Sequence, residues 1–325
     1  ISCSLVGSEM CIRDRLYTIF AGGFRAGTYI RLGENRDLSL YVGKDDSNNY
    51  SFEFRGRYTP VKISNSDVII VTQFKTQEYC TLRFSLSNRD LLEYFCTFCE
   101  DLFDSTMEIR EDEAAYKQLC ERYFSWKKLF RPHSGTMSDA EIVGLLGELL
   151  FMKEFMIPEW GVPVALDSWT GPEKTHKDFS NEQVWYEIKT INSGKTSVRI
   201  SSLEQLDSDM TGYLVVYDLE KMSSTFDGLK LNVLVQALMH IMTPSQREEF
   251  ISKLSLYNYD FSPTYDNFVY SVVGNSIYIV KDDFPRLCRS DIPIAINKVQ
   301  YELNLSEIES YNCLLYTSPS PRDCS

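Results

Sequence analysis

The sequence predicts an α/β protein of the α+β kind, with a mixed central sheet flanked by helices and a β-rich domain before it. The first part is a series of short strand-like runs separated by Gly, Asn, Asp and Ser. The second part opens with a long apolar helix, after which strand-like and helical segments follow one another. The 325 residues are 43% hydrophobic and 24% charged, a composition typical of a globular chain with a sizeable core.

The two ends of the chain differ from the rest because a single DNA segment could encode both of them. Residues 5–14 (LVGSEMCIRD) and 313–322 (CLLYTSPSPR) can be encoded by complementary strands of one short DNA segment. Two unrelated protein ends do not share such a relation, whereas a sequencing adapter carried into both ends of an assembly produces it. We therefore interpret residues 1–15 and 313–325 as adapter-like and exclude them from the fold, as one excludes a fusion scar.

The first part is predicted to form a β-rich domain over residues 16–110. Apolar side chains alternate between turn residues in five runs, and we expect strands at 25–33, 37–43, 49–56, 67–74 and 79–86. Helices are expected at 87–103 and 111–130, because apolar residues recur there every three or four positions. Residues 111–137 are assigned to a helix and a linker.

Aromatic residues in these strands leave two interpretations open. They fill the core of the sheet, which we favour, or they stack on nucleic-acid bases beside a modest basic cluster. The aromatic residues are Tyr29, Tyr41, Tyr50, Phe52 and Phe54, and the basic ones are Arg55, Arg57 and Lys62.

The second domain is predicted over residues 138–312. Its first helix, 138–156, begins at Ser138 with Glu141 three residues later, the pattern of a capping box. Strands are expected at 162–169, 175–180, 184–191, 197–200, 212–219, 267–274, 276–282 and 294–303. Helices are expected to start at 201–206 and to span 229–242 and 245–257.

One predicted strand of this domain carries paired charges. In VWYEIKTI (184–191), residues two apart share a face, so Glu187 and Lys189 point the same way. A hairpin with the preceding run THKDFS, with its turn centred between residues 182 and 183, places Asp178 directly opposite Glu187. Two facing carboxylates repel each other unless a cation lies between them. A divalent cation with oxygen ligands would supply that charge, and Lys189 would complete the balance.

A third carboxylate, Glu148, lies in the long helix. Because the segment IVGLLGELLFMKEF (142–155) is apolar nearly all round, the helix is expected to be buried. A glutamate in that setting needs a hydrogen-bonding partner or a metal ion. Gly144 and Gly147 would allow the helix to approach a sheet closely.

This set resembles the motif of the PD-(D/E)XK nuclease superfamily, which has the restriction-endonuclease-like fold. That motif has an acidic residue on one strand, (D/E)xK on the next and often a glutamate on a preceding helix, which Asp178, Glu187-Ile188-Lys189 and Glu148 match. The wider pattern GLLGELLF, KDFS, WYEIKT and SSLEQL is similar to a bacterial subfamily encoded beside restriction–modification genes. Lys177 stands where the motif often has proline, so Asp167 is kept as an alternative first acid.

The resemblance implies a Mg²⁺-dependent DNA endonuclease acting in bacterial restriction or anti-phage defence. It implies that Asp178, Glu187 and Glu148 bind Mg²⁺, with Mn²⁺ as a substitute. It also implies that Lys189 orients or activates the attacking water. These four residues are the predicted catalytic set. The predicted substrate-binding residues are Lys177 and Gln205. The alternative function is a catalytically inactive subunit of the same fold that binds DNA or assembles a defence complex.

The expected partners are DNA, a methyltransferase or helicase-like ATPase of the same locus, and a second copy of the chain. Because one active site cuts one strand, duplex cleavage would favour a homodimer or repeated visits by one chain. The formal net charge of −13 and the pI near 4.8 count against DNA binding through the overall field. Any contact with phosphates is therefore expected to come from a local basic surface.

Cysteine usage and hydropathy predict a cytoplasmic protein. Five of the nine cysteines lie between residues 16 and 312, an odd number that suits a reducing compartment. Cys96 and Cys99 form a CxxC inside a predicted helix, without a second pair at zinc spacing, and are interpreted as buried thiols. No apolar run reaches about 18 residues, so no transmembrane helix is expected.

Overall fold

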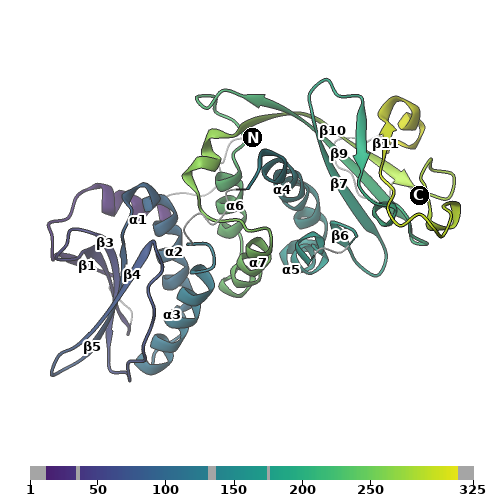
Figure 1. The fold of residues 1–325 in the computed structure, drawn as a ribbon. Helices are drawn as coiled ribbons and strands as arrows, with labels where there is room; N and C mark the ends of the chain where they lie inside the picture. The colour runs from purple at the N-terminus through teal and green to yellow at the C-terminus, as the bar shows by residue number, and fades with distance from the viewer. Residues whose placement is uncertain (1–11, 34–36, 131–136, 174–175, 314–325) are drawn as a thin grey trace. The chain divides into compact units, whose positions relative to one another are not determined.

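The computed structural model describes residues 12–33, 37–130, 137–173 and 176–313, and the chain forms two compact units, Ile1–Ser134 and Gly135–Ser325 (Figure 1). Residues 1–11 and 314–325 of the adapter-like ends, and 131–136 of the predicted linker, lie outside the described residues. The described part of those ends comprises residues 12–15, which begin helix α1 (Ile12–Ala21), and Cys313.

The first unit contains one antiparallel sheet with the strand order β1-β2-β3-β5-β4. All the strands predicted for this part are confirmed: β1 (Tyr29–Leu32), β2 (Ser39–Lys44), β3 (Tyr50–Gly56), β4 (Ile69–Lys75) and β5 (Cys80–Leu86). Phe52 and Phe54 are fully buried, so their interpretation as sheet core is confirmed. Tyr41 pairs with Glu53 and Val42 pairs with Phe52, so Tyr41 lies on the opposite face of the sheet.

Three helices pack on the Phe52 face of this sheet. They are α1, α2 (Leu92–Ser105), which follows a short 3₁₀ turn, and α3 (Asp112–Trp126), and all lie on the same side of the sheet (Figure 1). The ring of Phe84 in β5 lies 5.6 Å from that of Phe98 in α2 and 5.1 Å from that of Tyr123 in α3. Cys96 and Cys99 are fully buried within α2, as predicted. The aromatic core explains why a chain segment of this size folds as one compact unit.

The second unit contains a four-stranded mixed sheet with the order β10-β9-β7-β6. The strands are β6 (Phe179–Ser180), β7 (Trp185–Asn192), β9 (Gly212–Met222) and β10 (Val269–Val280). The neighbours β7 and β9 run parallel, whereas β6 with β7 and β9 with β10 run antiparallel. The two strands predicted at 267–274 and 276–282 are one strand, β10, with a register shift between Val272 and Gly274. An extra residue at such a bulge bends a long strand without ending it.

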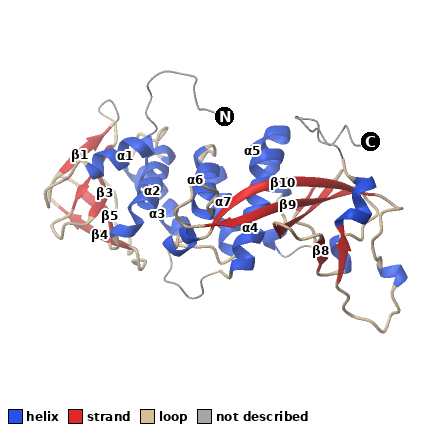
Figure 2. Cartoon of the chain, turned by 90° about the horizontal axis from the view of Figure 1, so that it is seen from above, coloured by secondary structure: helices blue, strands red, loops and turns tan. Residues whose placement is uncertain are grey.

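Helices cover one face of this mixed sheet, and α4 (Asp139–Phe151) is the one that packs on β7 (Figures 1 and 2). The predicted capping box is confirmed: Ser138 Oγ accepts from the Glu141 N–H at 3.4 Å, and Glu141 Oε2 accepts from the Ser138 N–H at 2.8 Å. A π-helical turn, Met152–Met156, continues α4. The other helices are α5 (Ile157–Ser168), α6 (Leu231–His240) and α7 (Pro244–Leu256).

The strand predicted at 162–169 is wrong, because this segment is the end of helix α5. Two β-branched valines and Pro163 suggested a strand. The tertiary structure instead buries Ala165, Leu166 and Trp169, which are spaced as on one face of a helix. Gly161, at φ 79°, interrupts the helix before this turn, a backbone conformation that favours glycine.

The opposite face of the mixed sheet is covered by a small two-stranded sheet of β8 (Ser197–Ile200) and β11 (Tyr301–Asn304). The 3₁₀ helices η4 (Leu203–Gln205) and η7 (Leu305–Tyr311) complete this layer. Its core includes Trp185 and Ile191 of β7 together with Val198, Ile200, Leu206, Leu214, Val216, Tyr278, Val280, Phe284, Leu303 and Ile308. The predicted α+β class, with a mixed central sheet flanked by helices, is confirmed, and the small sheet on the other face was not predicted. Across the described ranges, every helix is too short or too polar to cross a bilayer.

Candidate active site

The hairpin of β6 and β7 has the register that the sequence predicted. Phe179 pairs with Tyr186 and Ser180 with Trp185, so one step further along the same register Asp178 faces Glu187. The carboxylate of Asp178 is fixed by the backbone of β7, because its Oδ2 accepts a hydrogen bond from the Ile188 N–H at 2.7 Å. The first acid therefore lies at the beginning of β6, beside the middle of β7.

Glu187 and Lys189 form a buried ion pair on one face of β7. The Lys189 ammonium donates to Oε1 of Glu187 at 2.7 Å, and their side chains are 17% and 1% exposed, respectively. The other carboxylate oxygen of Glu187, Oε2, is buried and has no hydrogen-bond partner in the structure. A buried carboxylate oxygen without a partner is costly, so this atom has an unfilled requirement for a donor or a cation.

Glu148 reaches the same region from helix α4. The helix approaches β7 closely at Gly147, where an added Cβ would collide with Cγ2 of Thr190 and lie 3.4 Å from Cγ2 of Ile188. Glu148 itself is only 7% exposed, and two donors hold its Oε2: Trp169 Nε1 at 2.7 Å and the Tyr257 hydroxyl at 2.6 Å. The expectation that a glutamate on this apolar helix needs a partner is thus met by two aromatic side chains.

Gly171 brings the Glu148 carboxylate and Asp178 together. Its N–H donates to the carbonyl of Asp178 at 2.9 Å. An added Cβ at this position would lie 2.7 Å from the Tyr257 hydroxyl and 2.8 Å from Glu148 Oε2. Glycine is therefore required for the turn to pass between the two acids and the tyrosine.

Burial raises the pKa of all three carboxyl groups. Burial is the largest cause at each, and the charge of Asp178 further raises the pKa of Glu148 and that of Glu187, which reaches about 8. Burial acts to lower the pKa of Lys189, but the charges of Glu187, Asp178 and Glu148 outweigh it and raise this pKa. The four groups therefore share one electrostatic site, in which protons or a cation must offset the carboxylates.

The donor set fits a divalent metal ion. Buried carboxylate oxygens are the ligands that Mg²⁺ and Mn²⁺ prefer, and the partnerless Oε2 of Glu187 is one such oxygen. Within the described residues, however, no three His, Cys, Asp or Glu side chains are already arranged to enclose an ion.

The two predicted substrate-binding residues hold the 3₁₀ helix η4 in place. The Lys177 ammonium donates to the carbonyls of Glu204 and Gln205 at 2.7 and 2.8 Å, and lies 3.7 Å from the ring centre of Trp185. Burial lowers its pKa to about 8. Gln205 Oε1 accepts from the Ser201 N–H at 2.7 Å. These contacts give both residues a positioning role near β7, while contact with substrate stays a prediction.

Trp169 and Tyr257 were not predicted from the sequence as residues of this site, and the structure excludes Asp167 as the first acid. Trp169 and Tyr257 lie 21 and 109 residues from Glu148, distances at which no spacing rule connects side chains. Asp167, the alternative first acid, is exposed on helix α5. Asp178 is therefore the acid that accompanies Glu187.

An acid at the start of one strand, ExK on the next and a helix glutamate define the site of a PD-(D/E)XK nuclease-like protein. The chain belongs to the family described as "Putative PD-(D/E)XK family member, (DUF4420)", whose model matches residues 23–306. Proteins of the PD-(D/E)XK superfamily are usually nucleases, and many use divalent metals. No curated protein and no solved structure matches this chain.

Proposed function

We propose that this protein is a Mg²⁺-dependent endonuclease that hydrolyses phosphodiester bonds in DNA. The observation that carries the proposal is the buried cluster of three carboxyl groups around one lysine, with Oε2 of Glu187 lacking any partner. Such a cluster is a poor structural device, because isolated buried charges destabilise a fold unless they are compensated. Perturbed pKa values concentrated at one place are typical of functional sites.

In this proposal Asp178 and Glu187, with Glu148, hold the ion. When bound, a Mg²⁺ or Mn²⁺ ion supplies Lewis-acid stabilisation of the phosphate and lowers the pKa of a bound water. Trp169 and Tyr257 keep Oε2 of Glu148 in one orientation through bonds of 2.7 and 2.6 Å. Partners of this kind commonly set the affinity of a metal site.

Lys189 acts in this proposal as a fixed positive charge. Neighbouring carboxylates raise its pKa, which favours the protonated amine. The protonated amine donates hydrogen bonds that orient the attacking water and offset charge on the phosphate oxygens. The oxygen of water attacks phosphorus and the bond from phosphorus to one ester oxygen breaks. The proton that the water loses passes to solvent, and the released ester oxygen takes one up from solvent to become the hydroxyl of the new strand end.

The test is nicking of supercoiled plasmid in Mg²⁺, in Mn²⁺ and in EDTA. Wild-type protein is expected to convert supercoiled DNA to open circles only with metal, and Lys189→Ala to lose at least about 100-fold in rate. Lys195→Ala changes an exposed lysine in the turn after β7 and serves as the matched control. Full metal-dependent nicking by Lys189→Ala would refute the chemistry proposed for this residue.

A second candidate is a non-catalytic subunit of the same fold that binds DNA or assembles a complex. Tight DNA binding by wild-type protein, with no cutting under any divalent metal, would establish this alternative.

We further propose a role in bacterial restriction or anti-phage defence, with a methyltransferase or helicase-like ATPase of the same locus as partner. This part of the proposal is supported by the resemblance in the GLLGELLF and WYEIKT segments alone. Bacteria that carry the locus are expected to lower the plating efficiency of phage, and Glu187→Ala in that locus is expected to restore it. If phage plate equally well on bacteria with the wild-type locus and on bacteria with the Glu187→Ala locus, the defence role is excluded.

A further inference from the structure

The sheet of the first unit has one face that its helices do not cover. The described helices of this unit, α1 to α3, all pack on the face that carries Phe52 and Phe84. Residues that pair directly across neighbouring strands point to the same face of the sheet. Tyr41 pairs with Glu53, and Glu53 pairs with Arg83. Arg55 lies two residues after Glu53 and, like Phe74, pairs with Thr81, so all these side chains lie on the other face. We call this surface the open face.

Aromatic rings and guanidinium groups alternate across the open face. The guanidinium carbon of Arg55 lies 4.2 Å from the ring centre of Tyr41 and 5.5 Å from that of Tyr29. The guanidinium carbon of Arg83 lies 5.5 Å from the ring centre of Tyr29 and 5.1 Å from that of Phe74. These side chains come from all five strands, so the sheet as a whole builds the row Tyr41, Arg55, Tyr29, Arg83, Phe74.

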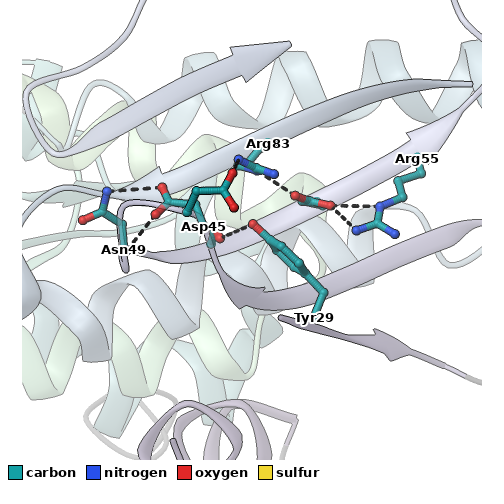
Figure 3. A network of polar contacts seen from close by, with 8 residues as sticks. Tyr29, Asp45, Asn49, Arg55 and Arg83 are labelled. Carbon is teal, nitrogen blue, oxygen red and sulfur yellow. Dashed lines mark hydrogen bonds and ion pairs between the residues drawn. The ribbon is translucent and has the colours of Figure 1, made fainter. Parts of the chain in front are cut away.

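A buried carboxylate fixes both arginines. Glu53 is 0% exposed, and its Oε2 accepts from Nε and Nη2 of Arg55 at 2.9 and 2.7 Å. Its Oε1 accepts from Nε of Arg83 at 2.6 Å. Figure 3 shows Arg55 and Arg83 near Tyr29, with dashed lines at both guanidinium groups. The Tyr29 hydroxyl and Ser51 Oγ are hydrogen-bonded at 3.0 Å. These contacts leave Nη1 of Arg55 and Nη2 of Arg83 outside the bonds to Glu53, while Nη1 of Arg83 lies 4.0 Å from the carboxylate of exposed Asp46.

The open face is locally basic in an acidic chain. Its strands carry Arg31, Arg55 and Arg83 against Glu53, whereas the whole chain has a formal net charge of −13. Phe74 is 41% exposed and Ile70, on the same face, is 38% exposed. Exposed rings beside oriented guanidinium groups complement bases and phosphates, because every base has a flat face that stacks and every nucleotide carries a negative charge.

We propose that the open face binds single-stranded DNA, with unpaired bases stacking on Tyr41 and Phe74 and with Arg55 and Arg83 contacting phosphates. A duplex hides the faces of its bases, so stacking on this surface requires unpaired nucleotides. The proposal goes beyond hydrolysis and does not depend on it, because binding at this face needs neither a metal ion nor the carboxylates of the second unit.

The test is binding of a fluorescent oligonucleotide of about 20 nucleotides to the full chain in EDTA, followed by anisotropy. The single strand is expected to bind at least about tenfold more tightly than the duplex of the same sequence. Phe74→Ala and Tyr41→Ala are each expected to weaken binding by about fivefold or more. Phe124→Ala is the matched control, because Phe124 is 45% exposed in the same unit but belongs to helix α3.

Two further variants separate this surface from folding and from an unspecific loss of positive charge. Phe74→Trp keeps a ring at the position and is expected to bind as wild type or more tightly, and Lys195→Ala, which changes an exposed lysine of the second unit, is expected to bind as wild type. Loss of binding with Phe74→Ala but not with Phe74→Trp would support stacking. The proposal is overturned if wild type binds single strand and duplex equally, fails to bind the single strand, or if Phe74→Ala behaves like Phe124→Ala. Because EDTA prevents metal-dependent cleavage, a failure of the nuclease proposal would leave these results unchanged.

Discussion

Two glycines of helix α4, three residues apart, should respond in opposite directions to replacement by alanine. An added Cβ at Gly147 would collide with Cγ2 of Thr190, whereas nothing lies within 4 Å of a Cβ added at Gly144. Alanine favours a helix over glycine by about 1 kcal/mol, so Gly144→Ala is expected to stabilise the protein by up to that amount. Overpacking of a tight contact typically destabilises a protein by about 1–3 kcal/mol, and at Gly147 it outweighs the helical gain.

The assay is urea unfolding of both variants, together with a compensating double variant. Thr190→Ser removes the Cγ2 atom that the new methyl group would meet, so Gly147→Ala with Thr190→Ser is expected to recover most of the lost stability. The collision also lies one residue from Glu148, so we expect Gly147→Ala to slow metal-dependent nicking and the double variant to restore it. Equal stability of Gly144→Ala and Gly147→Ala would show that the helix does not approach β7 as described.

Three further perturbations test the site and the core. Tyr257→Phe removes a 2.6 Å hydrogen bond to Glu148. The Mg²⁺ concentration for half-maximal nicking should rise about 10- to 100-fold, while urea unfolding stays unchanged. An unchanged metal requirement would contradict a role of Tyr257 in orienting Glu148. The pKa of Glu187 is about 8 in the folded protein and 4.5 in the unfolded chain, so the folded state binds its proton more tightly. The free energy of unfolding in EDTA should therefore fall as the pH rises from about 4.5 to about 8. The full effect is on the order of 5 kcal/mol, and Glu187→Gln should reduce the dependence measured by urea unfolding at several pH values, while the raised pKa values of Glu148 and Asp178 maintain the remainder. Asp101→Ala leaves Arg122 buried and without its 2.6 Å ion pair, and should cost about 3–5 kcal/mol; a loss below about 1 kcal/mol would mean that the pair is solvated.

The hairpin and the strands of the first unit could be predicted because their signals are local. Alternation of apolar side chains located β1 to β5, and the turn at 182–183 fixed the register that sets Asp178 opposite Glu187. The helix glutamate was found for a related reason, since Glu148 interrupts an apolar surface that needs a partner.

What could not be predicted depends on contacts between distant segments. Trp169 and Tyr257 meet at Glu148 only because α5 and α7 pack together, as the stacked rings of these two residues show. Segment 162–169 looked like a strand because it contains two valines and a tryptophan, yet burial of Leu166 and Trp169 on one side favours a helix. Likewise, no sequence spacing indicated that Arg55 and Arg83 would share Glu53.

The central claim is that carboxylates brought from α4, β6 and β7 share one cation site. Calorimetric titration of Mn²⁺ into the protein at pH 8, in buffers with different ionisation enthalpies, measures both binding and the protons that it displaces. We expect saturable binding with proton release in wild type, loss of both in Glu187→Gln, and no change in Glu182→Gln, which alters an exposed acid of the hairpin turn. Equal Mn²⁺ binding by wild type and Glu187→Gln would contradict the account.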